Sequence, residues 1–98
     1  MKVMGFSFVA RAKKDPQAVL DYALDWSDWL HAGETITEHA VSCDDADALI
    51  TNVALSGGKV RWWLGGGLPG KVYDIRVEIR TSSNRIDQRT LRVPVGNR

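Results

Sequence analysis

The clearest pattern along the chain is a strict alternation of apolar and charged residues over residues 73–80. The apolar members are Tyr73, Ile75, Val77 and Ile79. Successive side chains of a β-strand point to opposite faces, so this period of two is typical of a strand with one buried and one solvated face. Residues 67–70 read Gly-Leu-Pro-Gly, a composition typical of a turn. The pattern therefore predicts a turn that leads directly into an amphipathic strand.

Further short apolar runs, separated by glycine-rich or polar breaks, follow one another along most of the chain. Strands are expected around Ile36 within residues 34–42, and over residues 49–55, 59–64 and 86–95. The inward-facing members of the last two are Val60, Trp62, Leu64, Leu91, Val93 and Val95. Short strands with frequent turn signals between them are typical of a β-sandwich. We therefore expect an all-β fold of about six or seven strands.

Residues 17–30 carry two competing patterns. Strand-like alternation runs through Leu20, Tyr22, Leu24 and Trp26. Helical spacing runs through Val19, Tyr22, Ala23, Trp26, Trp29 and Leu30, with Asp15-Pro16 in the place of a helix start and Gly33 as a stop. Because the remainder of the chain has the pattern of an all-β fold, we favour a strand that ends near Trp26 and is followed by a turn.

The first 14 residues have the composition of an arm. They contain an apolar stretch followed by Arg11, Lys13 and Lys14, and then by Asp15-Pro16. Proline lacks a backbone donor and disfavours regular structure in the residue before it, so we divide the chain into an arm, 1–14, and a domain, 15–98. The arm either adds a strand to its own sheet or reaches a neighbouring molecule by β-augmentation. We favour the neighbour, because the basic residues and Pro16 separate the arm from the domain.

Composition and charge limit the compartment and the partners. The chain has 98 residues, a formal net charge of +1 and one cysteine, Cys43. An internal disulfide is therefore excluded, as suits a reducing compartment, and no global field attracts nucleic acid. The N-terminal charges follow the apolar stretch instead of preceding it, unlike a secretory signal, and no run approaches the ~20 apolar residues of a membrane span. We expect a soluble protein with no membrane contact and no specific nucleic acid.

The turn and strand around Tyr73 resemble the tyrosine corner of immunoglobulin-like and fibronectin type III sandwiches. In that motif a tyrosine near the start of a strand returns its hydroxyl to the backbone of the preceding turn. We therefore expect an immunoglobulin- or fibronectin-III-like β-sandwich with an N-terminal arm, in which Tyr73 is buried and bonded in this way. Such a scaffold favours a binding function over a catalytic one.

A second resemblance covers residues 15 to about 95. The block Asp15-Pro16, Asp21-Tyr22 and Asp25-Trp26-Ser27-x-Trp29-Leu30 resembles a family of small tailed-bacteriophage virion proteins described as fibre–tail adaptors or head–tail region proteins. Later segments that resemble the same family are Leu55–Gly58, Gly70–Tyr73 and Asp87–Arg89.

The resemblance implies an immunoglobulin-like fold and structural work in a phage particle, with no catalysis and no cofactor. It implies an adaptor that joins head–tail or tail components to tail fibres by protein–protein contacts. The implied partners are other virion proteins, such as portal, adaptor, tail or fibre proteins, together with further copies in a homo-oligomeric ring. The implied location is the virion, after synthesis in the host bacterial cytoplasm.

The residues themselves offer little for metal or nucleophile chemistry. Asp44, Asp45 and Asp47 have the oxygen ligands that calcium prefers, but the glycine and glutamate of an EF-hand loop are absent, so a solvated loop is favoured. In an extended segment His39 and Cys43 would lie roughly 13 Å apart, too far for an activated thiol. We expect no catalytic residue, no metal and no cofactor.

Asp21, Asp25 and Asp28 flank the aromatic block and allow two interpretations. Paired carboxylates about 5–9 Å apart can perform acid–base chemistry on a sugar. On a strand, however, Asp21 and Asp25 share the outer, hydrated face, where nothing apolar raises a pKa. They could instead pair with an arginine or lysine of a neighbouring copy.

The tryptophans are the strongest functional lead, because four in a chain of 98 residues exceed what a small core holds. Trp26 and Trp62 have core phase and, with Tyr22 and Tyr73, are predicted to be structural. Trp63 points the opposite way and Trp29 lies past a strand end, so each is either an edge plug or an interface anchor. The predicted interface residues are Phe6, Phe8, Arg11, Lys13, Lys14, Trp29 and Trp63. The alternative function is a fibronectin-like carbohydrate-binding or adhesion module, which would carry a row of exposed aromatics on one face.

Overall fold

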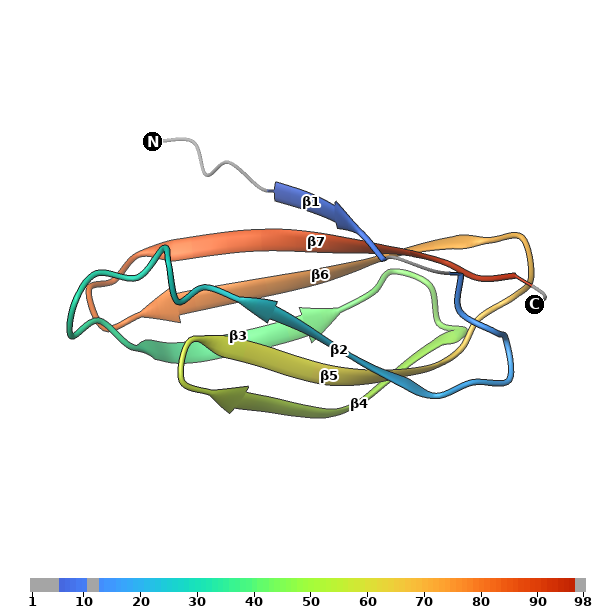
Figure 1. Ribbon diagram of the computed structural model, residues 1–98, viewed down its shortest axis with the longest axis horizontal. Coiled ribbons are helices and arrows are strands. Elements are labelled where there is room, and N and C mark those ends of the chain that lie inside the picture. The colour runs from blue at the N-terminus through green and yellow to red at the C-terminus, as the bar shows by residue number, and fades with distance from the viewer. Residues whose placement is uncertain (1–5, 11–12, 97–98) are drawn as a thin grey trace.

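The computed structural model describes residues 6–10 and 13–96, which form a two-sheet β-sandwich with no helix among them (Figure 1). The strands are β1 Phe6–Val9, β2 Leu20–Asp25, β3 Ile36–Ser42, β4 Ala48–Ser56, β5 Lys59–Gly66, β6 Val72–Thr81 and β7 Ile86–Pro94. One sheet has the order β1-β7-β6-β3 and the other the order β2-β5-β4. The predicted all-β sandwich is therefore confirmed. A helix able to cross a membrane is not found in the described ranges.

The strand order is compatible with an immunoglobulin-like topology. If β2 is matched to the B strand of an immunoglobulin domain, the orders β2-β5-β4 and β3-β6-β7 correspond to B-E-D and C-F-G. The pairs within these sets are antiparallel, and β1 joins β7 in parallel. The order supports the immunoglobulin-like interpretation, which stays a prediction at that level of detail.

Residues 17–30 form a strand and a turn, as favoured. β2 pairs antiparallel with β5, with Tyr22 opposite Trp62 and Leu24 opposite Val60. The chain then turns, and the N–H groups of Trp29 and Leu30 both donate to the carbonyl of Trp26 at 2.9 and 3.0 Å. The helical spacing does not decide the structure, because residues 20–25 pair along one edge of β5 and form a strand there.

The described part of the arm belongs to its own domain. β1 pairs with β7, with Phe8 opposite Leu91, and Ala10 N–H donates to the Arg92 carbonyl at 2.8 Å. Lys14 continues this contact through a bridge to Val95. The preference for a neighbouring molecule is therefore wrong for residues 6–10, because the nearest free edge is that of β7. The division at residue 14 stays a prediction.

The core forms where the inner faces of the two sheets meet. The alternating residues of β5, β6 and β7 point inward as predicted, and Leu24, Trp26 and Ile36 join them. Trp26, Trp62 and Tyr73 are fully buried, whereas Tyr22 is half-buried and stacks on Trp62 with ring centroids 6.3 Å apart. These placements agree with the structural roles predicted for the four aromatic residues.

The hydroxyl of Tyr73 ties β6 to the turn before it. It accepts a hydrogen bond from the backbone N–H of Leu68 at 2.8 Å and donates one to the carboxylate of Asp47. This confirms the predicted burial and backbone bond. Burial raises the pKa of Tyr73, while the tyrosine hydroxyl lowers the pKa of Asp47.

The glycine run at residues 65–67 forms a tight junction at the end of β5. Gly66 ends β5 with φ 71°, and a Cβ there would lie 2.4 Å from the carbonyl oxygen of Asp47. The carbonyl of Gly66 accepts a hydrogen bond from the ammonium of Lys14 at 2.7 Å. Lys14 is fully buried, and this burial lowers its pKa. The junction therefore joins the end of β5 to the segment after β1.

Tyr73→Phe should lower the free energy of unfolding by about 1–3 kcal/mol, because it leaves the part-buried N–H of Leu68 and the carboxylate of Asp47 without their partner. Tyr22→Phe is the matched control, because the Tyr22 hydroxyl forms no hydrogen bond with the described residues. Urea denaturation measures both. Equal midpoints for wild type and Tyr73→Phe would reject the role of the hydroxyl.

Gly66→Ala should destabilise the protein more than Gly57→Ala. Both glycines have positive φ, which costs an L-residue about 1–2 kcal/mol. A Cβ at Gly57 meets nothing within 4 Å, whereas one at Gly66 meets backbone and adds overpacking of about 1–3 kcal/mol. Thermal unfolding compares the two variants, and equal losses would contradict the close approach.

Candidate interaction surfaces

The acidic loop after β3 is held by ion pairs and hydrogen bonds to β6 and the turn before it. Asp44 pairs with Arg76 at 2.6 Å and Asp45 with Lys71 at 3.1 Å, and Asp47 accepts from Tyr73. Within residues 6–10 and 13–96, no cluster of three or more His, Cys, Asp or Glu residues is arranged to hold a metal ion. These carboxylates act in the fold by fixing the β3–β4 connection.

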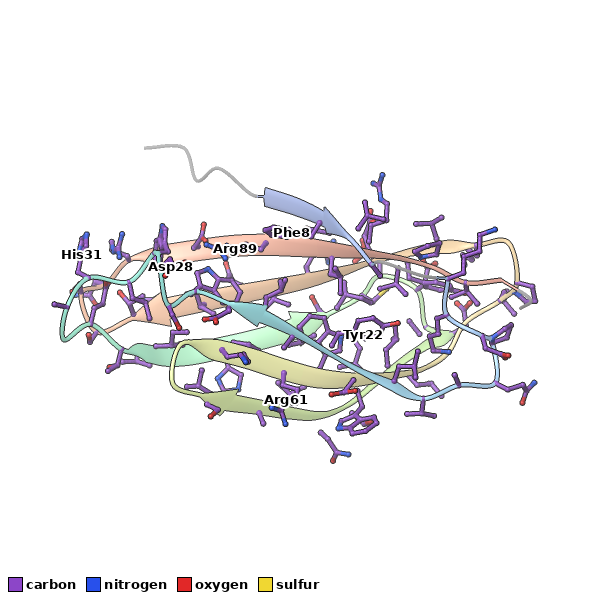
Figure 2. The ribbon with its side chains drawn as sticks, viewed as in Figure 1. Phe8, Tyr22, Asp28, His31, Arg61 and Arg89 are labelled. Carbon is purple, nitrogen blue, oxygen red and sulfur yellow. The ribbon has the colours of Figure 1, made fainter. Side chains whose placement is uncertain are left out.

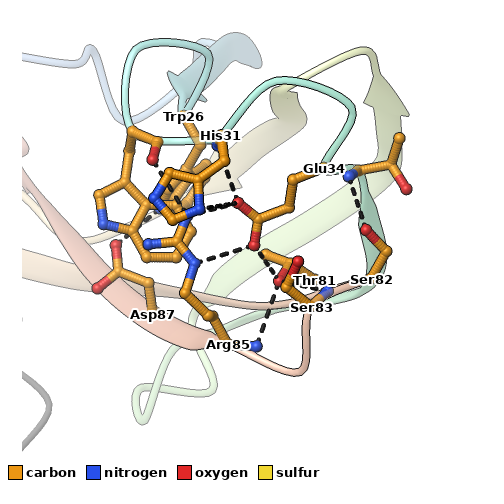
Figure 3. A network of polar contacts seen from close by, with 10 residues as sticks. Trp26, His31, Glu34, Thr81, Ser82, Ser83, Arg85 and Asp87 are labelled. Carbon is orange, nitrogen blue, oxygen red and sulfur yellow. Dashed lines mark hydrogen bonds and ion pairs between the residues drawn. The ribbon is translucent and has the colours of Figure 1, made fainter.

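A buried ion pair closes one end of the sandwich (Figure 3). The Glu34 side chain is 1% exposed and accepts hydrogen bonds from the Arg85 guanidinium at 2.5 and 2.9 Å and from the Thr81 hydroxyl at 2.5 Å. The backbone N–H of His31 donates to the same carboxylate at 2.9 Å. Arg85 and Thr81 together hold the pKa of Glu34 well below its ordinary range.

Trp29 lies within this closure. The Arg85 guanidinium sits 3.7 Å from the centre of the Trp29 ring and donates to its backbone carbonyl at 3.1 Å. The ring is half-buried, so it covers the end of its own domain. Of the two predicted roles, plug and interface anchor, this placement favours the plug.

The motif residues of the family resemblance meet around Trp26. Its indole N–H donates to Asp87 at 2.8 Å, and the Arg89 guanidinium lies 4.7 Å from the ring centre. Arg89 also donates to the backbone carbonyl of Asp25 at 3.0 Å. The Asp-Trp block and the Asp-Gln-Arg element are therefore one contact between the two sheets, made by residues more than sixty positions apart.

The first exposed apolar surface is the free edge beside β1. Phe8 is 40% exposed and Val9 is 67% exposed. Figure 2 shows Phe8 at β1, on the side of the molecule away from Arg61. Phe6 lies in the same strand, opposite Arg89. This surface carries no charged side chain within β1 itself.

The second exposed apolar surface is the outer face of the β2-β5-β4 sheet. Trp63 projects from β5 between Asp21 of β2 and Thr51 of β4. One row further, Val19 and Leu49 approach the Cβ position of Gly65 at 3.3 and 3.9 Å. Sequence reasoning singled out Trp63 but missed Val19 and Leu49, whose meeting depends on the bare surface of Gly65.

The predicted interface residues are therefore distributed unevenly. Phe8, Lys13 and Trp63 are exposed. Lys14 is a correction: it is fully buried with its ammonium on backbone carbonyls, so it is absent from the surface. Arg11 lies outside the described residues. The exposed aromatic side chains of the described part are Phe8 and Trp63, on different sheets, so they form no row on one face.

A β-sandwich with two separate apolar surfaces, in which Glu34, Asp47 and Asp87 are bonded within the fold, is typical of scaffold and binding proteins. The model of one protein family, described as "Podophage GP4 fiber-tail adaptor protein gp77", matches residues 14–94. The chain belongs to this family of phage fibre–tail adaptors, which has a structural role in the virion and binds other phage tail proteins. No curated protein matches the chain.

The Glu34 cluster predicts the acid response of stability. In the folded protein the pKa of Glu34 lies below the ordinary value of 4.5. The contribution of Glu34 to the free energy of unfolding is therefore present above about pH 4.5 and is lost as the pH falls toward the folded pKa. Glu34→Gln should lower stability at pH 7 and flatten its decline below pH 4.5. The exposed Glu38 provides the control variant, Glu38→Gln. Denaturation midpoints measured from pH 7 to pH 3 test this, and parallel curves for wild type and Glu34→Gln would contradict it.

Proposed function

We propose that this protein is an adaptor that joins head–tail or tail components to tail fibres through protein–protein contacts. The observation that carries the proposal is the presence of two exposed apolar surfaces on different sheets, one at β1 and one around Trp63. An adaptor must contact two partners at once, and a domain with two separated surfaces can do so. Family membership supports the role.

The β1 edge is the surface that suits a partner strand. Exposed strand edges invite pairing unless charges, prolines or bulges block them. Among the described edge strands, β3 carries the Glu38–Arg80 ion pair, β2 carries acidic residues, and β4 has an irregular register after Thr51. Among the described strands, β1 contains no charged residue and no proline, and its length of four residues is what limits pairing at its edge. A strand of another virion protein can therefore pair beside Phe8 and Val9 by β-augmentation.

The adaptor acts in several copies, arranged as a homo-oligomeric ring in the particle. Its formal net charge of +1 imposes little repulsion between neighbouring copies. The protein is made in the host bacterial cytoplasm and enters the particle during assembly. It works by binding alone and has no catalytic activity.

Phe8→Ser should reduce incorporation of the protein, and of the fibres, into assembling particles while the isolated domain keeps most of its stability. Val53→Ser is the matched control, because Val53 is equally exposed but lies on β4. Quantitative protein analysis of purified particles measures both. The adaptor role fails if particles lacking this protein retain their fibres and their infectivity.

A further inference from the structure

The backbone of β1 divides into groups that bond to β7 and groups that face the free edge. Neighbouring residues of a strand direct their N–H and C=O groups to opposite edges. β1 runs parallel to β7, and the N–H of Ala10 donates to the carbonyl of Arg92 in β7 at 2.8 Å. Because the direction alternates, Phe8 bonds toward β7 as Ala10 does, whereas Ser7 and Val9 direct their backbone groups away from it. These two residues therefore supply the donors and acceptors of the free edge.

The side chain of Phe8 lies beside this edge on the inner face of its sheet. It is opposite Leu91, a core residue, and yet is 40% exposed. The strand that faces β2 is β7, since Arg89 donates to the backbone carbonyl of Asp25. β1 lies one strand further out (Figure 1). An aromatic side chain is thus left uncovered next to unpaired backbone groups, which together suit an extended segment with an apolar residue.

We propose that β1 accepts an extended segment of another virion protein, which pairs antiparallel with the backbone of Ser7 and Val9 and sets an apolar side chain against Phe8. This inference rests on the proposed function and names the chemistry of the strand that the adaptor binds. Antiparallel pairing suits so short an edge. Each partner residue opposite Ser7 or Val9 exchanges both of its backbone bonds, so a segment no longer than β1 suffices, whereas parallel pairing spreads the same bonds over a longer segment.

The pairing defines what the partner segment must contain. Its middle residue lies opposite Phe8 on the same face, where side chains of an antiparallel pair approach closely, so an aromatic or β-branched residue is favoured there. The residues on either side of it lie opposite Ser7 and Val9 and each donate an N–H. Neither of them is therefore proline. The partner is recognised by one apolar residue between two residues that are not proline, within an extended segment.

The occupant is a different protein and not a second copy. The β1 strands of two copies could pair antiparallel, but such a contact is two-fold and closes after two chains. The copies of a cyclic ring instead meet through two different surfaces. In the proposed ring, the β1 edge is therefore left for another virion protein.

The first test complements a phage whose copy of this gene is disrupted with variants of the full chain. Val9→Pro removes an N–H of the free edge and leaves the bonds to β7 in place, a position at which edge strands tolerate proline. Val9→Thr is the matched control, since it keeps the N–H and the branched side chain. Particles made with Val9→Pro should carry about tenfold less of this protein, of the fibres, or of both than particles made with Val9→Thr. Equal contents overturn the proposal.

The second test measures amide hydrogen exchange of the unaltered chain, so it holds even if Val9→Pro lowers the unfolding midpoint. In the dilute isolated chain the amides of Ser7 and Val9 should exchange faster than those of Phe8 and Ala10, which are bonded to β7. In purified particles the exchange at Ser7 and Val9 should slow by about tenfold or more. Fast exchange at both residues in the particle overturns the proposal.

The remaining outcomes separate this proposal from its alternatives. Slow exchange at Ser7 and Val9 in the dilute isolated chain means that the edge is filled within its own chain, and slowing that appears only as the isolated chain is concentrated assigns the edge to a second copy. Either result overturns the proposal. If both amides are slowed in the particle and Val9→Pro is excluded from it, while particles lacking the protein keep their fibres, the strand contact stands and the proposed function alone fails.

Discussion

The hydrogen bond from the Trp26 indole to Asp87 is the contact on which the closure of the sandwich depends. It joins the end of β2 in one sheet to β7 in the other, inside a chain that has no disulfide to do so. A buried indole N–H without a partner would cost about 1–3 kcal/mol, so the aspartate and the tryptophan need each other. Arg89 covers the ring and reaches the backbone of Asp25, which completes the joint.

Two further polar anchors hold the rest of the frame. At the Trp29 end, Glu34 and Arg85 connect the turn after β2 to the turn between β6 and β7. The hydroxyl of Tyr73 connects β6 to the loop before β4 and to the turn that precedes it. Each anchor is fully hydrogen-bonded, which is the condition under which buried polar groups specify an arrangement instead of weakening it. These polar contacts hold the two sheets together without using the two exposed apolar surfaces.

The surfaces that bind other proteins are separate from the groups that stabilise the fold. Most charged side chains around β6 form ion pairs within their own chain, so this face offers few unpaired charges to another protein. The β1 edge and the face around Trp63 leave backbone groups and apolar area available. A protein that must bind others in a particle, and yet stay folded without a disulfide, is served by keeping these two tasks on separate surfaces.

Local pattern determined the strands, and long-range pairing determined the surfaces. The alternation from Tyr73 to Ile79 was sufficient to predict β6 and its buried face, because a period of two is written into neighbouring residues. The burial of Lys14 and the shielding of Trp29 were not predictable, because they depend on Gly66 and Arg85, more than fifty residues away in the chain. The parallel pairing of β1 likewise required the edge of β7. Sequence by itself therefore determined the all-β class and the core, while only the tertiary structure decided which residues remain at the surface, since burial depends on partners that local spacing does not encode.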